Sequence, residues 1–289
     1  MSESLGHVLI TGCSTGIGRA SVIHLAKLGF NVLAGVRNAT DRQSIEQAGG
    51  GNVKAILLDV TDSAAIRAAA KTVGEICGQR GLAGLVNNAG IVVHGPVEFV
   101  PIRRWREQFE VNVIGQIELT QAMLPLLRMR VAASGRGSAR IVNMSSIAGL
   151  IAQPILSPYN ASKYALEAVS DSLRMELRPQ GILVCLIEPG AIDTPIWGKA
   201  EANPDVFPAD HPARSLYGKA IDGITNHSRK SARNAVPAEK VAQVVGRCMT
   251  RKRPRTRYPV CWESHVGSAA KGFLPTAIMD AGICWALGM

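Results

Sequence analysis

The sequence predicts a single α/β domain built on a doubly wound parallel sheet. Short apolar, β-branched runs alternate with amphipathic segments along the chain, and these two patterns are typical of strands and helices respectively. Parallel strands need crossover connections, so the alternation indicates a sheet with helices on both faces. No linker rich in Pro, Gly or Ser divides residues 1–289 and no internal repeat is present, so we expect one domain.

Four predicted strands lie in the first third of the chain. They are short apolar runs at residues 7–11, 31–36, 53–60 and 84–90. The first strand leads into glycines and then into a helix from Gly16 to Leu28, whose apolar residues recur at helical spacing. An alanine-rich helix is expected over residues 62–76, and either Thr61 or Asp62 is a suitable N-cap for it.

The middle of the chain continues the alternation of helices and strands. The expected elements are a helical region from Ile102 to Arg130, an exposed loop at 131–139, a strand at Ala139–Met144, a helix from Tyr159 to Leu177 and a strand at 182–188. Residues 193–236, of mixed composition with several prolines, are predicted to be a long insertion near the strand ends that serves as a substrate lid. Residues 251–289 are expected to form a C-terminal extension.

Composition excludes several classes of protein. Hydrophobic residues make up 47% and charged residues 19% of the chain, which is not the composition of a disordered protein. No run of eighteen apolar residues is present, and this argues against a transmembrane helix. The N-terminus lacks a basic start followed by an apolar stretch, so we expect no export signal and a cytoplasmic location.

Cysteine, histidine and aromatic residues give no sign of a metal or nucleic-acid site. The six cysteines include no CxxC pair and no Cys/His cluster has zinc spacing, so we expect neither disulfides nor a bound metal. Lys and Arg exceed Asp and Glu by 32 to 22, a net charge of +10. Because the aromatic residues are few and not interleaved with the basic ones, we expect no nucleic-acid partner. The basic clusters 128–140 and 251–257 are interpreted as solvated or membrane-facing surface.

A glycine-rich turn joins the first predicted strand to the first helix. Glycines allow a sharp turn and a close approach of the backbone to a pyrophosphate, whose charge then faces the helix N-terminus. Such a turn also fits an ordinary strand-to-helix connection, but the strand before it and the helix after it favour dinucleotide binding. The predicted contacts are Gly12, Ser14, Thr15, Gly16, Ile17 and Gly18.

Tyr159 and Lys163 are a second candidate pair, at the start of a predicted helix. Residues four apart on a helix share one face. A phenol has a pKa near about 10, and a neighbouring ammonium lowers that pKa by stabilising the phenolate. A tyrosine with a lowered pKa can act as a general acid or base. Taken alone, the pair also fits an ordinary helix-surface contact, so its interpretation depends on the rest of the sequence.

Five motifs occur in the order in which one enzyme family carries them. They are TGCSTGIG at residues 11–18, NNAG at 87–90, a serine pair at 145–146, YNASK at 159–163 and PG at 189–190. Together they resemble the short-chain dehydrogenase/reductase family over about the first 195 residues. The resemblance implies a Rossmann fold, a nicotinamide cofactor and the interconversion of an alcohol and its carbonyl. Because family members are often dimers or tetramers, it also implies a homo-oligomer.

The resemblance further implies which residues act. The family's serine commonly lies thirteen residues before its tyrosine, which selects Ser146, with Ser145 as the fallback. Ser146 would hydrogen-bond the substrate oxygen and Tyr159 would exchange a proton with it. Lys163 would lower the pKa of Tyr159 and bind the nicotinamide ribose. Asn112 matches the family's upstream asparagine, which positions a water in a proton relay, and it also fits a buried residue that satisfies a backbone carbonyl.

The predicted cofactor is NADP, with NAD as the alternative. A carboxylate at the end of the second strand would favour NAD by bonding the adenosine ribose, but that position is Val36 and the next residue is Arg37. Arginine pairs well with a ribose phosphate, although a solvated surface arginine also fits. The other cofactor contacts that the resemblance implies are Asp59, Val60, Asn88, Ala89, Gly90, Pro189, Gly190, Ile192 and Thr194.

The last third of the chain bears on the substrate. Residues 251–260 (RKRPRTRYPV) resemble a C-terminal stretch of the retinol- and hydroxysteroid-dehydrogenase-like branch, which implies a lipophilic alcohol or ketone of the steroid or retinoid kind. Six apolar residues of the predicted lid have two interpretations: they line an apolar pocket, or they pack within the lid itself. They are Pro195, Ile196, Trp197, Val206, Phe207 and Leu216. The apolar tail 271–289 is too short and broken to span a bilayer. It is expected to cover the substrate cleft, to join a subunit contact or to rest on a membrane.

A catalytically silent cofactor-binding sensor or scaffold is the alternative of a different class. Such a protein would have no chemical need for Tyr159 and Lys163. The complete set of Asn112, Ser146, Tyr159 and Lys163 therefore favours an enzyme.

Overall fold

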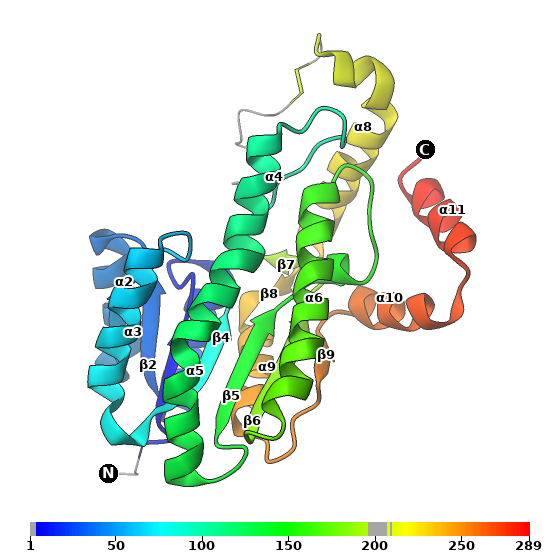
Figure 1. The fold of residues 1–289 in the computed structure, drawn as a ribbon. Coiled ribbons are helices and arrows are strands. Elements are labelled where there is room, and N and C mark those ends of the chain that lie inside the picture. The colour runs from blue at the N-terminus through cyan, green and yellow to red at the C-terminus, as the bar shows by residue number, and fades with distance from the viewer. Residues whose placement is uncertain (1–3, 196–206, 209) are drawn as a thin grey trace.

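The computed structural model describes residues 4–195, 207–208 and 210–289. At its centre is a parallel sheet of seven strands in the order β3-β2-β1-β4-β5-β6-β9 (Figure 1). The strands are β1 (His7–Ile10), β2 (Asn31–Val36), β3 (Val53–Leu57), β4 (Leu82–Asn87), β5 (Ala139–Met144), β6 (Ile182–Glu188) and β9 (Arg257–Pro259). Every neighbouring pair is parallel, so the prediction of a doubly wound α/β fold is confirmed.

Helices cover both faces of this sheet, and an apolar core lies under each layer. The first layer consists of α1 (Gly16–Lys27), α2 (Ala39–Gly49) and α9 (Ala238–Thr250). The second, in front of the sheet in Figure 1, consists of α3 (Ser63–Cys77), α5 (Gly115–Ser134) and α6 (Ser157–Leu177). Both cores are largely aliphatic, as expected for parallel strands that are buried on both faces.

The predicted strands all form, although some of their ends differ. The third strand stops at Leu57 instead of residue 60, and the fourth begins at Leu82. Asp62 caps α3: its carboxylate accepts hydrogen bonds from the backbone N of Ala64 at 2.7 Å and of Ala65 at 3.2 Å. Of the two residues that the sequence offers as the cap, the structure therefore has the aspartate in this position.

The helical region predicted to begin at Ile102 is interrupted once. It consists of α4 (Ile102–Phe109), a π-helical turn at Glu110–Ile114 and then α5. The prediction of an exposed loop from residue 131 is wrong at its start, because α5 continues through Ser134. The loop begins at Gly135, whose φ of +85° ends the helix in a conformation that glycine adopts at little cost.

The C-terminal third adds elements beyond the sheet. They are β7 (Ile192–Asp193), α8 (Pro212–Arg233), β8 (Val236–Pro237), α10 (Trp262–Phe273) and α11 (Thr276–Ala286). Within the predicted insertion 193–236, the described residues are mainly the helix α8, not an irregular loop. Figure 1 shows α10 and α11 leading away from the sheet, with α11 beyond the end of α10. Three short 3-10 turns complete the structure: Gly50–Asn52, Gly78–Arg80 and Ile147–Gly149.

Sequence reasoning did not name α2, nor the individual elements after β6, of which β9 belongs to the central sheet. Helix α2 buries one residue, Ile45, so it carries no apolar stripe at helical spacing. Its cap is nevertheless regular, because Asn38 accepts a hydrogen bond from the backbone N of Asp41 at 2.8 Å. Strand β9 has three residues and begins at Arg257, the last residue of the basic cluster 251–257, so local composition indicates surface.

The strand order reverses between β1 and β4, which are neighbours in the sheet although β2 and β3 lie between them in the chain. At such a switch point the loops after the strands diverge to opposite faces and leave a crevice beyond the carboxyl ends of the strands. The glycine-rich turn follows β1, and the NNAG motif begins at the last residue of β4. Both motifs are therefore brought to this crevice.

Candidate active site

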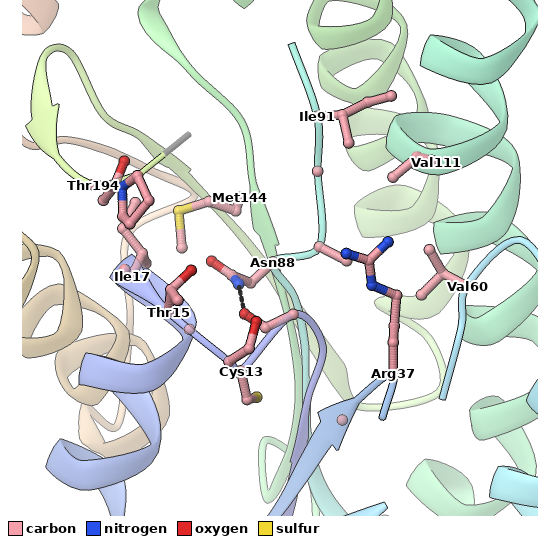
Figure 2. A pocket seen from close by; sticks show the side chains of 18 of the residues that line it. Cys13, Thr15, Ile17, Arg37, Val60, Asn88, Ile91, Val111, Met144 and Thr194 are labelled. Carbon is pink, nitrogen blue, oxygen red and sulfur yellow. Dashed lines mark hydrogen bonds between the residues drawn. The ribbon is translucent and has the colours of Figure 1, made fainter. Parts of the chain in front are cut away.

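A cavity of about 380 Å³ occupies the crevice at the switch point. Its wall comes from the segments that follow β1, β2, β3, β4, β5 and β6, together with the start of α6. Figure 2 shows that Arg37, Asn88 and Thr194, which are far apart in the sequence, face the same space. The topology thus gathers motifs spread over more than half of the chain around one cavity.

The glycine-rich turn can be this tight only because two positions have no side chain. A Cβ on Gly18 would lie 2.1 Å from the carbonyl oxygen of Gly12, closer than any real contact. Gly12 itself has φ of +67°, and its Cβ would lie 2.9 Å from Cα of Ala89. The backbone N–H groups at the start of α1 therefore face the cavity without a covering side chain, as a pyrophosphate requires.

The end of β4 holds this turn in place. Asn88 Nδ2 donates hydrogen bonds to the carbonyl oxygens of Thr11 at 2.8 Å and of Gly12 at 3.2 Å. In return, Thr11 Oγ1 accepts hydrogen bonds from the backbone N of Asn88 and of Ala89, both at 2.9 Å. These contacts explain why the two motifs occur together: one motif fixes the shape of the other.

Arg37 lies at the second end of the cavity. It directly follows Val36, the last residue of β2, and its side chain is exposed. In Figure 2 the guanidinium extends from the strand end toward Val60 and Val111 across the cavity wall. The Asp59 carboxylate is engaged by its own loop instead of by Arg37: its Oδ1 accepts hydrogen bonds from the Thr61 backbone N at 2.9 Å and from Thr61 Oγ1 at 2.7 Å. The cationic side chain at this end is thus open to a ligand.

Tyr159 and Lys163 lie in the third part of the cavity wall, on the first turns of α6. Both are buried, with 8% and 5% of their surface exposed. The Lys163 ammonium donates a hydrogen bond to the Met144 carbonyl at 2.7 Å and lies 5.7 Å from the centre of the Tyr159 ring. The predicted one-face arrangement of this pair is present.

Burial changes the acidity of both groups. It raises the pKa of the Tyr159 phenol, while the hydrogen bond with Ser146 lowers it. This net direction is opposite to the lowering expected from the Lys163 spacing, because spacing carries no information on burial. Burial also lowers the pKa of Lys163 to about 8, against the opposing effect of the nearby Glu167 carboxylate. Since an ammonium in this pocket loses its proton more readily than in water, Glu167 matters for the charge of Lys163.

The two adjacent serines differ in their surroundings. The Ser146 hydroxyl lies beside Tyr159 and lowers the pKa of its phenol; it accepts a hydrogen bond from the Ala148 backbone N at 3.1 Å and donates one to the Pro189 carbonyl at 3.5 Å. The Ser145 hydroxyl is buried and makes no hydrogen bond within the described part of the chain. Both serines line the cavity, and the contact with Tyr159 favours Ser146 as the residue that meets a substrate oxygen.

Asn112 is the one predicted site residue that does not line the cavity. It is fully buried in the π-helical turn. Its Oδ1 accepts from the Ile91 backbone N at 2.9 Å, and its Nδ2 donates to the Ile91 carbonyl at 3.1 Å and to Ser162 Oγ at 3.2 Å. Gln108 holds the same loop by donating to the Ile91 carbonyl at 3.0 Å. Asn112 therefore satisfies a backbone carbonyl in the loop after Gly90, as one of its two interpretations has it, and its part in a proton relay stays a prediction.

All other predicted cofactor contacts line the cavity, and several residues join them that sequence reasoning did not assign to the cofactor. The predicted set comprises the six residues of the glycine turn with Arg37, Asp59, Val60, Asn88, Ala89, Gly90, Tyr159, Lys163, Pro189, Gly190, Ile192 and Thr194. The added residues are Cys13, Gly35, Val36, Leu58, Thr61, Ile91, Glu107, Val111, Met144, Ser145 and Pro195. Most of them flank a strand end, so the sheet topology was the signal that could have found them.

The residues proposed for an apolar lid have different outcomes. Pro195 lines the cavity. Phe207 is buried and packs edge-to-face on Phe99, with ring centres 6.4 Å apart. Leu216 is 66% exposed, so it does not line a pocket. Ile196, Trp197 and Val206 lie outside the described residues.

Two features of the described residues concern metal ions and membranes. No three His, Cys, Asp or Glu side chains there gather as a metal ion would need. Among the helices in the same residues, none has both the length and the hydropathy that crossing a bilayer requires.

Comparison with known families decides the family. Residues 6–205 match the pattern described as short chain dehydrogenase. The chain belongs to the short-chain dehydrogenase family. It is accordingly an oxidoreductase, as the resemblance carried by the five motifs implies. Members of the retinol- and hydroxysteroid-dehydrogenase-like branch are among its relatives.

The relatives match nearly the whole chain. An NADPH-dependent 3-dehydrocapnine reductase from Ornithobacterium rhinotracheale is 34% identical over 95% of this chain and 94% of its own. The 17-beta-hydroxysteroid dehydrogenase type 6 of Bos taurus is 35% identical over 94% of this chain and 86% of its own. Retinol dehydrogenase 5 of Mus musculus is 34% identical over 97% of this chain and 88% of its own.

Solved structures agree on the fold. A short-chain dehydrogenase from Streptomyces avermitilis superposes with a TM-score of 0.78 at 29% identity, covering 99% of this chain and 98% of the other. A short chain dehydrogenase/reductase from Burkholderia phymatum, in complex with NAD, superposes with a TM-score of 0.76 at 24% identity, covering 98% and 97%. The second likeness shows the fold alone.

Proposed function

We propose that this protein is an NADP-dependent oxidoreductase that interconverts a primary or secondary alcohol and its carbonyl on a lipophilic substrate. The observation that carries the proposal is that one cavity brings the glycine-rich turn together with Ser146, Tyr159 and Lys163. The turn offers uncovered backbone N–H groups for a pyrophosphate, and the other three residues offer a proton donor and its neighbours beside it.

The residues of the cavity divide the chemistry between them. A bound nicotinamide supplies the hydride for carbonyl reduction and accepts it in alcohol oxidation. Ser146 donates a hydrogen bond to the substrate oxygen and so orients it. Tyr159 gives its phenol proton to that oxygen during reduction and takes it back during oxidation. Lys163, as an ammonium, favours the phenolate and binds the ribose hydroxyls. Pro189, Gly190, Ile192 and Thr194 hold the nicotinamide end.

Arg37 supports NADP as the cofactor. The last residue of β2 is Val36 and not a carboxylate, so nothing at this position repels a ribose phosphate. The guanidinium of Arg37 is exposed at the cavity and forms a planar donor for phosphate oxygens. The relative from Ornithobacterium rhinotracheale is named as NADPH-dependent. NAD is the alternative, because a solvated arginine at this position is also compatible with that cofactor.

An apolar cluster around Tyr159 supports a lipophilic substrate. Tyr159 packs in one cluster with residues of the loop after β5, of α8 and of the segment after α11. Its buried members are Val92, Ala148, Ile155, Leu156, Tyr159, Phe207, Ala213, Ala220, Ile221, Ile224 and Leu287. A substrate that reaches the Tyr159 hydroxyl would therefore approach through hydrocarbon surroundings. The relatives named for retinol and hydroxysteroids are in agreement with this.

The catalytically silent alternative makes a different use of the same cavity. A sensor or scaffold needs the glycine turn but not the buried Lys163, whose burial is costly for a charged group. The placement of Ser146 beside Tyr159, where it lowers the pKa of the phenol, also suits proton exchange with a substrate. These two features favour the oxidoreductase.

The test is a titration of the purified protein with NADPH and NADH by nicotinamide fluorescence, followed by turnover with a panel of lipophilic ketones. We expect tighter NADPH binding and ketone-dependent loss of NADPH absorbance. Tyr159→Phe should keep the NADPH affinity and lower kcat by about a hundredfold or more. Tyr164→Phe, one helical position outside the motif, should leave kcat within about twofold. Equal turnover in Tyr159→Phe would refute the mechanism, and no binding of either nucleotide would refute the proposal.

The proposal for partners rests on the two C-terminal helices, where several large apolar side chains lie on the surface. They include Trp262, Phe273 and Trp285, which are 71%, 87% and 84% exposed. Exposed apolar patches mark contacts with proteins or membranes. We propose first that these side chains form a subunit contact in a homo-oligomer, a dimer or tetramer, and second that they make peripheral contact with a membrane. Sedimentation velocity tests the first, and flotation with anionic vesicles tests the second.

A further inference from the structure

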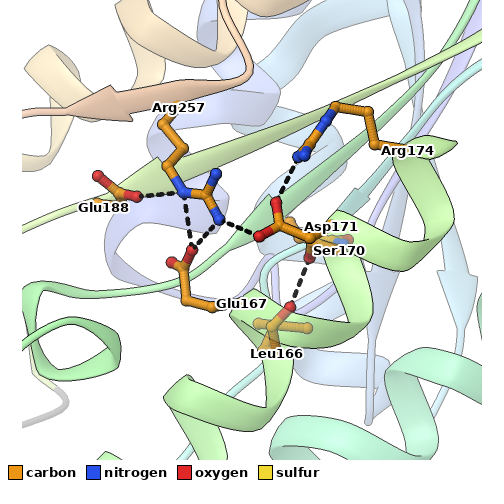
Figure 3. Close-up of polar contacts among 8 residues, drawn as sticks. Leu166, Glu167, Ser170, Asp171, Arg174, Glu188 and Arg257 are labelled. Atoms are coloured by element: carbon orange, nitrogen blue, oxygen red, sulfur yellow. Dashed lines mark hydrogen bonds and ion pairs between the residues drawn. The ribbon is translucent and has the colours of Figure 1, made fainter.

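A half-buried group of charges next to the candidate active site, in which Glu167 and Glu188 are buried and Arg257 and Asp171 are partly exposed, takes no part in the chemistry proposed above. Arg257, on β9, contacts three carboxylates at once (Figure 3). Its Nη2 lies 2.7 Å from Asp171 Oδ2 and 3.1 Å from Glu167 Oε2, and its Nε lies 3.2 Å from Glu188 Oε1. Arg174 pairs with Asp171 on the outer side of the group. One guanidinium therefore joins β9 to both α6 and the end of β6.

One arm of this group leads to Lys163. Glu167 follows Lys163 by one turn on α6, so both side chains lie on the same face of the helix. Both are buried, with 7% and 5% of their surface exposed. The Glu167 carboxylate favours the ammonium form of Lys163, against burial, which lowers the pKa of Lys163. Because Arg257 binds Glu167 directly, it controls both the position and the effective charge of the group that faces Lys163.

The other arm leads to Ser146. Glu188 is completely buried and directly precedes Pro189 and Gly190, which line the cavity. The Pro189 carbonyl accepts a hydrogen bond from the Ile147 backbone N at 2.9 Å and from Ser146 Oγ at 3.5 Å. An ion pair at Glu188 thus holds the segment on which the Ser146 hydroxyl rests. The register of the strands supports this, because Glu188 is opposite Pro259, two residues beyond Arg257.

The balance of charge makes Arg257 hard to replace. Around Glu188 the described part of the chain places the carboxylates of Glu167 and Asp171 on α6, Arg257 on β9 and the more distant Lys271 on α10. Arg257 is the cation in direct contact with Glu188. Without it, two buried carboxylates would face one another, and α6 and β6 would separate at this point or one carboxylate would take up a proton.

We propose that Arg257 is a positioning residue of the active site: by binding Glu167 and Glu188 together, it sets Lys163 and the Pro189 segment beneath Ser146 in the relative arrangement that cofactor binding and proton transfer need. This inference rests on the proposed function of the cavity. It adds to it a residue that lies outside the cavity wall and nearly a hundred positions beyond Lys163 in the chain.

The test compares Arg257→Gln with Arg257→Lys and with Arg174→Gln as the matched control. Arg174 also pairs with Asp171 but contacts neither Glu167 nor Glu188 in the contacts described. We expect Arg257→Gln to lower kcat about tenfold or more, because misplaced groups lose rate steeply. Arg257→Lys should recover part of the rate, and Arg174→Gln should stay within about twofold of the wild type. If Arg174→Gln loses as much as Arg257→Gln, the effect belongs to the general stability of α6 and the proposal is wrong.

A second readout does not depend on turnover and separates positioning from folding. The dissociation constant of NADPH is measured from pH 7 to 10, where loss of the Lys163 proton should weaken binding. Glu167→Gln should move the midpoint of this weakening about half a pH unit or more to lower pH, because a charge that favours the ammonium is removed. Arg257→Gln should move it to higher pH, because Glu167 is then no longer neutralised. Arg174→Gln should leave it unchanged.

The outcomes distinguish this inference from the function on which it rests. Failure of the wild type to bind NADPH would refute the proposed function itself. NADPH binding with identical midpoints in the wild type, Glu167→Gln and Arg257→Gln would refute only the role of Arg257. If Arg257→Gln does not fold, Glu167→Gln still decides, because it leaves the contacts of Arg257 with Asp171 and Glu188 in place.

Discussion

At the scale of single residues, Arg37 is the side chain that we expect to distinguish the two nicotinamide nucleotides. Its guanidinium is exposed at the cavity, directly after the last residue of β2. Hydrogen bonds to charged groups contribute about 1.5–3 kcal/mol. Arg37→Ala should therefore raise the dissociation constant of NADPH about tenfold to a hundredfold and that of NADH less than about threefold. Fluorescence titration with both nucleotides measures this.

Arg42, five residues further along the chain, provides a matched control for this prediction. Arg42, on α2, is also exposed and forms an ion pair with Glu46, but it does not line the cavity. Arg42→Ala should bind both nucleotides as the wild type does. An equal loss of NADPH and NADH affinity in Arg37→Ala would show that Arg37 supports the cavity and does not select the nucleotide.

The adjacent serines allow a second prediction at this scale. Ser146 lies beside Tyr159 in the cavity wall and lowers the pKa of its phenol, so Ser146→Ala should lower kcat by about a hundredfold or more. The Ser145 hydroxyl is buried without a hydrogen bond in the described part of the chain. Ser145→Ala should therefore keep kcat within a few-fold and leave the unfolding temperature unchanged or raised. Steady-state kinetics and thermal denaturation of both variants decide, and the reverse result would assign the role to Ser145.

The site was predictable from the sequence where a motif is local, and not where it depends on packing. Tyr159 and Lys163 share a helix face at any burial, so their spacing predicts their arrangement. The direction of the Tyr159 pKa follows from burial, which spacing does not contain. The contact of Arg257 with Glu167 joins residues 90 positions apart, and only the pairing of β9 with β6 brings them together.

At the scale of elements, the same distinction explains which helices and strands were predicted. Buried strands such as β2 and β4 are largely apolar runs and stand out in the sequence. The π-helical turn at Glu110–Ile114 was not predicted, because one extra residue in a turn leaves an apolar pattern of this length unchanged. Helix α2 is mostly polar, so its hydrogen-bonded cap at Asn38 was the better signal.

The contact between α8 and the C-terminal segment gives the prediction at this scale. A Cβ on Gly223, within α8, would lie 2.3 Å from the carbonyl oxygen of Leu287. Gly223→Ala should therefore push the segment after α11 away from α8 and expose the apolar cluster that Leu287 closes. Limited proteolysis should cut residues 276–289 several-fold faster than in the wild type, and the unfolding temperature should fall.

Gly218 provides the control in the same helix. No atom lies within 4 Å of the Cβ that an alanine would add there. Since alanine is favoured over glycine in a helix by up to about 1 kcal/mol, Gly218→Ala should raise the stability slightly and leave proteolysis unchanged. Faster cleavage in both variants would mean that α8 itself, not its contact with Leu287, determines access to the C-terminal segment.

At the scale of the whole molecule, Glu188 makes global stability depend on pH. Burial, and then the nearby Glu167 carboxylate, raise the pKa of Glu188 from 4.5 to about 7. Between these values the folded protein holds a proton on Glu188 that the unfolded chain has released, so the contact with Arg257 becomes a full ion pair only above about pH 7. The free energy of unfolding therefore falls as the pH rises through this window, and the contribution is fully lost above about pH 7.

Glu188→Gln removes this titration and keeps a neutral side chain of similar shape, so it isolates the effect. The difference in free energy of unfolding, variant minus wild type, should increase by on the order of 2 kcal/mol from pH 5 to pH 8, because only the wild type loses stability over this range. Urea denaturation at several pH values measures the difference. Glu176→Gln, an exposed carboxylate on the same helix as Glu167, should show no such change relative to the wild type. A constant difference across this range would mean that Glu188 stays ionised in the fold, held by Arg257, and that the three carboxylates around one guanidinium share their charge without a proton.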